Sequence, residues 1–106
     1  MFCLYYNIYM KKKSYIYILT NNEQTSLYVG VTNDLIKRVF THKKSMSSGL
    51  GKERDLNKLV YYEGYSDISQ AILREKELEI ATRQKKIDLI NKFNPDWDDL
   101  YRKLAV

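Results

Sequence analysis

Short runs of apolar and aromatic residues, separated by polar loops, recur through the first half of the chain. Tyrosine and β-branched residues are frequent in these runs, and both kinds of residue favour extended strands. A polar loop, NNEQTS, separates the first run, SYIYILT, from the second, LYVGV. The pattern predicts three strands, over residues 14–20, 27–31 and 58–65.

Apolar residues at helical spacing occupy much of the remaining sequence. Leu35 and Val39 lie four positions apart, so one face of their segment is apolar. A loop with two glycines and three serines follows over 45–57. The same criterion predicts helices over 34–44, 67–83 and 85–93, the second capped by Ser66 or Asp67.

The end of the chain carries signals for one more helix. Asn94 can cap this helix and Pro95 suits its first position, because proline has no backbone N–H to leave unpaired there. Four apolar residues follow at helical spacing, namely Trp97, Leu100, Tyr101 and Leu104. The order β-β-α-β-α-α-α predicts an α+β fold in which helices flank a small three-stranded antiparallel sheet.

Size and charge narrow the classes of protein to which the chain can belong. Its 106 residues suffice for one domain, which we place at 14–106, and its net charge of +5 favours an anionic partner, nucleic acid first. Cys3 is the only cysteine and His42 the only histidine. An internal disulfide, a cysteine zinc site and a double-histidine metal centre are therefore excluded.

Residues 1–13 are predicted to form an N-terminal extension to that domain. Residues 1–9 are apolar and aromatic, but they lack the basic start and the small-residue cleavage site of a secretory signal. They are either an extra edge strand or the product of a start codon assigned upstream of Met10. No run reaches transmembrane length, so we expect a cytoplasmic protein that does not enter a membrane.

Glu75 stands out in the predicted helix over 67–83. A half-buried carboxylate has to be paired, hydrogen-bonded or bound to a cation. A salt bridge to one of the many lysines and arginines is the plainer explanation, and a metal ion is the functional one. The core-facing positions on this helix are Ile68, Ala71, Ile72, Glu75, Leu78 and Thr82, and only Glu75 is charged.

Three residues near the first predicted helix also suggest contact with a ligand. Arg38 and His42 lie four apart and share a helix face, where they can grip a phosphate. Gly30 lies inside a strand, which suggests that another group approaches the backbone closely there. An exposed basic helix and a tight packing position explain the same residues without a ligand.

The arrangement of these residues resembles the GIY-YIG nuclease family. The first of its two triplets reads YIY and ends at Tyr17, and the second reads YVG and starts at Tyr28. The segment TNDLIKR with Arg38 follows, and His42 comes one helical turn later. The agreement of several separated positions, in order and in spacing, is far more specific than any one of them.

Later positions extend the resemblance. Glu75 in AILREKEL and Asn94 in NPDW stand where the family has its metal-binding glutamate and a late asparagine. The resemblance runs from Tyr15 to about Tyr101, and Tyr15 replaces the glycine of the first triplet. It is greatest to small stand-alone bacterial members, which are related to the nuclease module of the excision-repair C subunit.

The resemblance implies a phosphodiester hydrolase that uses one divalent ion. Glu75 would bind Mg²⁺ or Mn²⁺, and Arg38 would stabilise negative charge on the phosphate. Tyr17 would act as the general base or orient the attacking water, with His42 as the alternative carrier of the proton. Tyr28 would hydrogen-bond the phosphate or its partner phenol.

Three further residues are expected near the substrate, namely Gly30, Lys37 and Asn94. Lys37 is one of the cations that would help a phenol to lose its proton. A helix-capping role accounts for Asn94 equally well.

The sequence thus predicts a metal-dependent endonuclease, with DNA more probable than RNA as substrate. We expect its cutting to depend on DNA structure or on a protein partner, since the chain has no room for a separate recognition domain. The alternative is a catalytically weak nucleic-acid-binding module of the same fold. A structural or interaction protein, suggested by the aromatic N-terminus, is the third reading.

Overall fold

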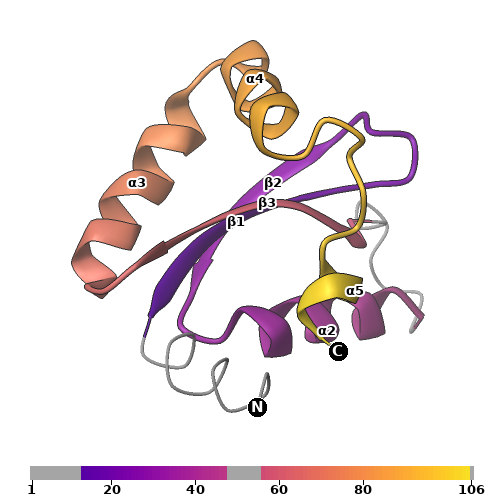
Figure 1. Cartoon of the computed structure of the whole chain (residues 1–106), viewed down its shortest axis with the longest axis horizontal. Helices are drawn as coiled ribbons and strands as arrows, with labels where there is room; N and C mark the ends of the chain where they lie inside the picture. Colours follow the sequence, from indigo (N-terminus) through magenta and orange to yellow (C-terminus); the bar gives the residue numbers. More distant parts are fainter. Residues whose placement is uncertain (1–12, 48–55, 106) are drawn as a thin grey trace.

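The computed structural model describes residues 13–47 and 56–105. It confirms the predicted α+β fold, a three-stranded antiparallel sheet flanked by helices (Figure 1). The predicted extension over 1–13, apart from Lys13, falls outside the described residues. The elements are β1 (Ser14–Thr20), β2 (Leu27–Thr32), α2 (Leu35–Ser47), β3 (Lys58–Tyr65), α3 (Ile68–Ile80), α4 (Arg83–Phe93) and α5 (Tyr101–Leu104).

β1 is the central strand of the sheet, with β2 and β3 antiparallel on either side. Tyr17, in the middle of β1, lies opposite Gly30 of β2 and Tyr62 of β3. All seven residues of β1 are buried, because strands pair with both of its edges and helices cover both of its faces. In Figure 1, α3 and α4 lie on one side of the sheet, and α2 and α5 lie on the other.

Side chains alternate along β1, so the protein has two cores. The tyrosines of β1 belong to the core on the α2 side of the sheet, which consists of Tyr15, Tyr17, Leu19, Leu35, Val39 and Leu59. The isoleucines belong to the core on the α3 side, which consists of Ile16, Ile18, Val29, Val60, Tyr61, Ala71, Leu78, Ile90 and Trp97. The strand therefore presents its tyrosines to the helix that carries Arg38 and His42.

Two helix boundaries differ from the sequence prediction by a few residues. α2 continues to Ser47, so the first three residues of the predicted 45–57 loop are helical, and most of that loop lies outside the described residues. α3 ends before Thr82, because this residue caps α4 by accepting a hydrogen bond from the N–H of Lys85 (3.1 Å). None of the helices described is long and apolar enough to cross a membrane.

The predicted start of the last helix is wrong. Asn94 is the C-cap of α4 and not the N-cap of a further helix, and only four residues, in α5, are helical after it. Trp97 has a φ of 53°, a left-handed conformation that interrupts any helix. The Asn94 amide holds this turn by donating to the carbonyl oxygens of Val60 (3.1 Å) and Asp98 (2.9 Å). Tertiary contacts here outweigh the local signals.

α3 is rotated relative to its predicted orientation. Ala71 is buried as predicted, but the side chains of Ile68 and Ile72 are 46% and 39% exposed. Arg74 turns toward the sheet instead, and its guanidinium makes two 3.0 Å hydrogen bonds to the carboxylate of Glu63 on β3. This ion pair fixes which side of the helix faces β3.

Candidate active site

Tyr17 and Gly30 form the floor of the candidate site, on the α2 side of the sheet. The two residues are cross-strand partners, and the side chain of Tyr17 is buried. A Cβ atom at position 30 would lie 2.5 Å from both Cζ and Oη of the Tyr17 phenol. The absence of a side chain at Gly30 therefore leaves the space that the phenol of Tyr17 occupies.

Two more rings lie beside Tyr17. The Tyr28 phenol hydrogen-bonds to the Tyr17 phenol, and the two ring centroids are 6.2 Å apart. The ring of His42 lies 6.3 Å from that of Tyr17 and 5.4 Å from that of Tyr28. Because Tyr28 is 39% exposed and Tyr17 only 1%, the group extends from the protein surface to a buried phenol.

α2 presents Arg38 and His42 from consecutive turns. The carboxylate of Asp34 stabilises the start of this helix by accepting a hydrogen bond from the N–H of Lys37 (3.2 Å). Arg38 lies close enough to Tyr17 for its charge to act on the phenol. Lys37 and Arg38 also line a cavity of about 400 Å³. The other residues around this cavity are Thr32, Asn33, Asp34 and Thr41.

Burial and charge shift the two candidate proton acceptors in opposite directions. Burial raises the pKa of the Tyr17 phenol well above its usual 10, and Tyr28 adds to this, while Arg38 opposes it. Burial lowers the pKa of His42 below its usual 6.5, and the positive charge of Arg38 lowers it further. Near neutral pH, Tyr17 is therefore a hydrogen-bond donor and His42 a neutral imidazole that can accept a proton.

Glu75 comes from α3, on the opposite side of the sheet from α2. The residue is half-buried, as the apolar periodicity predicts. Burial raises the pKa of Glu75, and a hydrogen bond with Glu79 and the charge of Glu79 raise it further, while Lys76 lowers it. The structure thus brings Tyr28, Gly30, Arg38 and His42 together around Tyr17, whereas Glu75 lies on α3.

The plainer explanation for Glu75, a salt bridge, does not apply within the described residues. Their ion pairs with printed geometry join Lys43 to Asp99 and Arg74 to Glu63 and Glu77. The carboxylate of Glu75 therefore has no cationic partner at ion-pair distance in this part of the chain.

Asn94 lies at the end of α4, away from the helix that carries Arg38. Its amide nitrogen donates to two backbone carbonyls, and its side-chain oxygen accepts from the N–H of Asp98 (3.2 Å). The residue is 6% exposed. These bonds engage both ends of the amide, so Asn94 serves to hold the turn after α4.

Thr32, Asn33 and Thr41 line the same cavity as Arg38 and were not predicted to contact a ligand. Thr32 and Asn33 precede α2, where hydroxyl and amide groups are common as ordinary helix caps, and Thr41 lies within the helix, so residue type alone does not mark these positions as a site. Across residues 13–47 and 56–105, no cluster of three or more His, Cys, Asp or Glu side chains could hold a metal ion. A metal at Glu75 would therefore take most of its oxygen ligands from water and substrate.

Comparison with known proteins identifies the family. The family model described as the GIY-YIG catalytic domain matches residues 13–94. The chain therefore belongs to the GIY-YIG family, and this domain implies nuclease-type activity and binding to nucleic acid.

The curated relatives are small bacterial proteins of unspecified function. A UPF0213 protein of Staphylococcus saprophyticus is 38% identical over 79 residues, which are 74% of this chain and 95% of the relative. A UPF0213 protein of Clostridium perfringens is 36% identical over 78 residues, 74% of this chain and 83% of the relative. No solved structure matches the chain significantly.

Proposed function

We propose that this protein is a metal-dependent endonuclease that hydrolyses phosphodiester bonds in DNA. The observation that carries the proposal is the group of Tyr17, Tyr28, Arg38 and His42, in which two phenols, an imidazole and a guanidinium meet on one side of the sheet. Membership of a family of nuclease domains and the net charge of +5 support it.

The proposed reaction is an attack of water on the phosphorus atom. An oxygen–phosphorus bond forms, the bond from phosphorus to the 3′ oxygen breaks, and that oxygen takes a proton from solvent. Arg38 stabilises the negative charge that builds up on the phosphate oxygens, and the exposed phenol of Tyr28 donates a hydrogen bond to them. The buried phenol of Tyr17 holds Tyr28 in place through their hydrogen bond. The products carry 5′-phosphate and 3′-hydroxyl ends.

His42 is the proposed acceptor of the water proton. A general base has to be unprotonated at working pH, and the lowered pKa of His42 meets this condition. The Tyr17 phenol, with its raised pKa, keeps its proton and serves as a donor. These opposite shifts in pKa favour His42 over Tyr17 as the group that accepts the proton.

Glu75 is the residue that would hold the Mg²⁺ or Mn²⁺ ion. Its carboxylate is a hard oxygen ligand, and its lack of an ion pair in the described chain leaves it available to a cation. When bound, the ion would polarise the phosphate and lower the pKa of a water molecule. We further propose that cutting depends on DNA structure or on a protein partner.

A second candidate function is a nucleic-acid-binding module that does not cleave. The position of Glu75 favours it, since this carboxylate belongs to the helix on the opposite side of the sheet from Arg38. In such a module the basic residues of α2 would bind phosphate, and the metal ligand would not act on it.

A cleavage screen separates the two candidates. Supercoiled, nicked and branched DNA and matching RNA structures are incubated with Mg²⁺ or Mn²⁺ and the wild-type protein, Glu75→Ala or His42→Gln. We expect the wild type to cut at least one DNA and both variants to lose at least about 100-fold in rate. Asp88→Ala, an exposed carboxylate on α4, is the matched control and should cut at the wild-type rate.

Cutting that survives in Glu75→Ala would remove Glu75 from the mechanism. Binding of DNA by the wild type without cutting, across all metals and structures, would establish the second candidate instead. Cutting of RNA alone would overturn the choice of DNA.

A further inference from the structure

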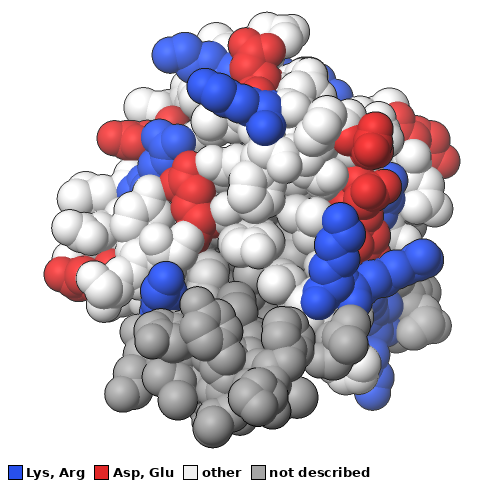
Figure 2. All heavy atoms as spheres, viewed as in Figure 1, with Lys and Arg blue, Asp and Glu red and all other residues white. Residues whose placement is uncertain are grey.

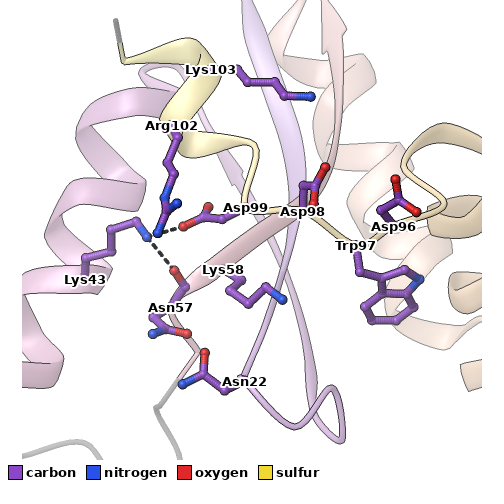
Figure 3. Close-up of a pocket in the computed structure, with 10 residues that line it drawn as sticks. All are labelled: Asn22, Lys43, Asn57, Lys58, Asp96, Trp97, Asp98, Asp99, Arg102 and Lys103. Carbon is purple, nitrogen blue, oxygen red and sulfur yellow. Dashed lines mark hydrogen bonds and ion pairs between the residues drawn. The ribbon is translucent and has the colours of Figure 1, made fainter.

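A second polar pocket lies where the segment before α5 passes the start of β3 (Figure 3). Its volume is about 540 Å³. α2 contributes Lys43, the neighbour of His42, so the pocket adjoins the helix that carries the candidate active site. The residues around it are Asn22, Lys43, Asn57, Lys58, Asp96, Trp97, Asp98, Asp99, Arg102 and Lys103.

Asp99 holds the walls of this pocket together. One of its carboxylate oxygens lies 2.6 Å from Nζ of Lys43, and the other accepts a hydrogen bond from the N–H of Leu59 (3.1 Å). Lys43 also donates to the backbone oxygen of Asn57 (2.7 Å). Because Asp99 is neutralised by Lys43 and bound to β3, the pocket is a fixed feature of the fold.

Three further cations around the pocket make no ion pair among the described residues. Lys58, Arg102 and Lys103 all line it, and Figure 3 shows them coming from β3 and α5. In that view, Arg102 extends toward Lys43, and Asp96 lies on the other side of the pocket, next to Trp97. Figure 2 shows basic side chains gathered on the side of the molecule where α5 lies, next to a group of acidic ones. These three cations therefore bring unpaired positive charge to the pocket, which the carboxylates of Asp96 and Asp98 also line.

The pocket also borders a buried acceptor without a partner. The side-chain oxygen of Asn57 is inaccessible to solvent and accepts no hydrogen bond. A buried acceptor left unsatisfied costs free energy, so such a group calls for an explanation. A hydrogen-bond donor on a molecule in the pocket, reached by a small movement of the amide, would satisfy it.

We infer that this pocket binds one nucleotide of the substrate strand, outside the scissile bond. Lys58, Arg102 and Lys103 hold the phosphate of this nucleotide, and Asn57 accepts a hydrogen bond from its base. This inference deepens the proposed function and rests on it. The C-terminal segment, which follows the matched catalytic domain, would thus help to hold the DNA strand that α2 contacts.

Phosphate interference tests the inference. Single methylphosphonates, which lack the negative charge, replace each phosphate of a bound DNA in turn, and affinity is measured by fluorescence anisotropy in EDTA. For the wild type we expect a loss of about fivefold at one or two phosphates away from the cut. In the double variant Arg102→Ala and Lys103→Ala, these positions should become insensitive and overall affinity should fall about fivefold.

A matched control removes two exposed lysines from another face. Lys85→Ala with Lys92→Ala, on α4, should leave both the affinity and the interference pattern as in the wild type. Equal losses in the two double variants would overturn the inference, because general attraction would then explain them. An unchanged interference pattern in the Arg102 and Lys103 variant would overturn it as well.

Asn57→Ala supplies a readout that does not depend on charge. Removing an unsatisfied buried acceptor should leave thermal stability unchanged or raise it. Affinity for DNA should nevertheless fall about threefold, the value of a weak hydrogen bond. A variant with undiminished affinity would refute the role of Asn57. Failure of the wild type to bind any nucleic acid would defeat the proposed function itself, and this inference with it.

Discussion

The placement of the Tyr17 phenol depends on a residue without a side chain. Gly30 lies directly opposite, and the ring occupies the space of the missing Cβ. In this position the Tyr17 hydroxyl points toward Tyr28 and α2. The glycine of the YVG triplet is thus part of the site through the position it gives to Tyr17.

Gly30→Ala should displace this phenol and destabilise the protein. The added methyl group lies 2.5 Å from Tyr17, so the buried ring has to move, and we expect a loss of about 1–3 kcal/mol in the free energy of unfolding. Urea unfolding followed by circular dichroism measures it. Gly64→Ala is the control, since its nearest contact is 3.2 Å, and should lose less. Equal losses would show that Gly30 has no special role.

The pH dependence of cleavage should follow His42. Among the described residues, Tyr17, Tyr28 and Arg38 lie around its imidazole, and its pKa is lowered below 6.5. The specificity constant should rise with pH through this lowered pKa and level off near neutral pH. In Tyr17→Phe the rise should persist at reduced activity, and in His42→Gln it should vanish. A rise that vanishes only in Tyr17→Phe would make the phenol the base.

Among single residues, the sequence separated Tyr17 from Tyr15 only through the family resemblance. Both residues point to the same side of β1, so periodicity treats them alike. In the structure, Tyr15 packs in the core on the α2 side of the sheet, where it is 3% exposed and lies edge-on to Tyr62. The directions in which the pKa values of Tyr17 and His42 shift depend on burial and on Arg38, so residue spacing could not predict them.

At the level of elements, one ion pair joins α3 to the sheet. Glu63 of β3 receives hydrogen bonds from Arg74, Tyr61 and Tyr65. Burial alone would raise the pKa of Glu63, but these bonds, that of Arg74 first, lower it below its usual 4.5. Folding thus favours the ionised carboxylate.

Removing this pair should lower stability in a pH-dependent way. Because its folded pKa is lowered, Glu63 stabilises the protein above the unfolded pKa, and this contribution disappears as pH falls through the folded pKa. Arg74→Ala should cost about 2 kcal/mol at pH 7. Glu63→Gln should flatten the fall in stability below pH 4.5, as measured by urea unfolding at several pH values.

Arg83→Ala is the control for this experiment. Within the part of the chain that the structure describes, its guanidinium donates only to the backbone oxygen of Gln24 (3.2 Å), so its loss should cost less than about 0.5 kcal/mol. A cost for Arg74→Ala no larger than this would show that the ion pair does not stabilise the fold.

The strands were predictable and the last helix was not, for physical reasons. β1 and β3 are bounded by polar residues, and their apolar runs match the observed limits. The signals at Asn94 and Pro95 are local, whereas the turn that contains these residues is held by a hydrogen bond from the Asn94 amide to the backbone oxygen of Val60, which is distant in sequence. The orientation of α3 likewise depends on a partner of Arg74 that lies on another element.

For the whole molecule, net charge predicts how DNA affinity responds to salt. With +5 charges and phosphate contacts from α2 and the proposed pocket, the logarithm of the binding constant should fall linearly with the logarithm of salt concentration. The double variant of Arg102 and Lys103 should reduce this slope by about two. Anisotropy titrations between about 50 and 200 mM salt measure the slope. Affinity independent of salt would contradict binding through phosphates.

The position of β1 in the middle of the sheet also matters while the chain is being synthesised. β1 and β2 are neighbours in sequence and can form a hairpin as soon as both have left the ribosome. β3, the partner of the other edge of β1, is synthesised only after α2. Until then that edge carries free N–H and C=O groups, which attract strands of other nascent chains. Slow synthesis between the release of β2 and the release of β3 from the ribosome would prolong this exposure, so the yield of native protein should depend on how fast the chain is translated after β2 has emerged.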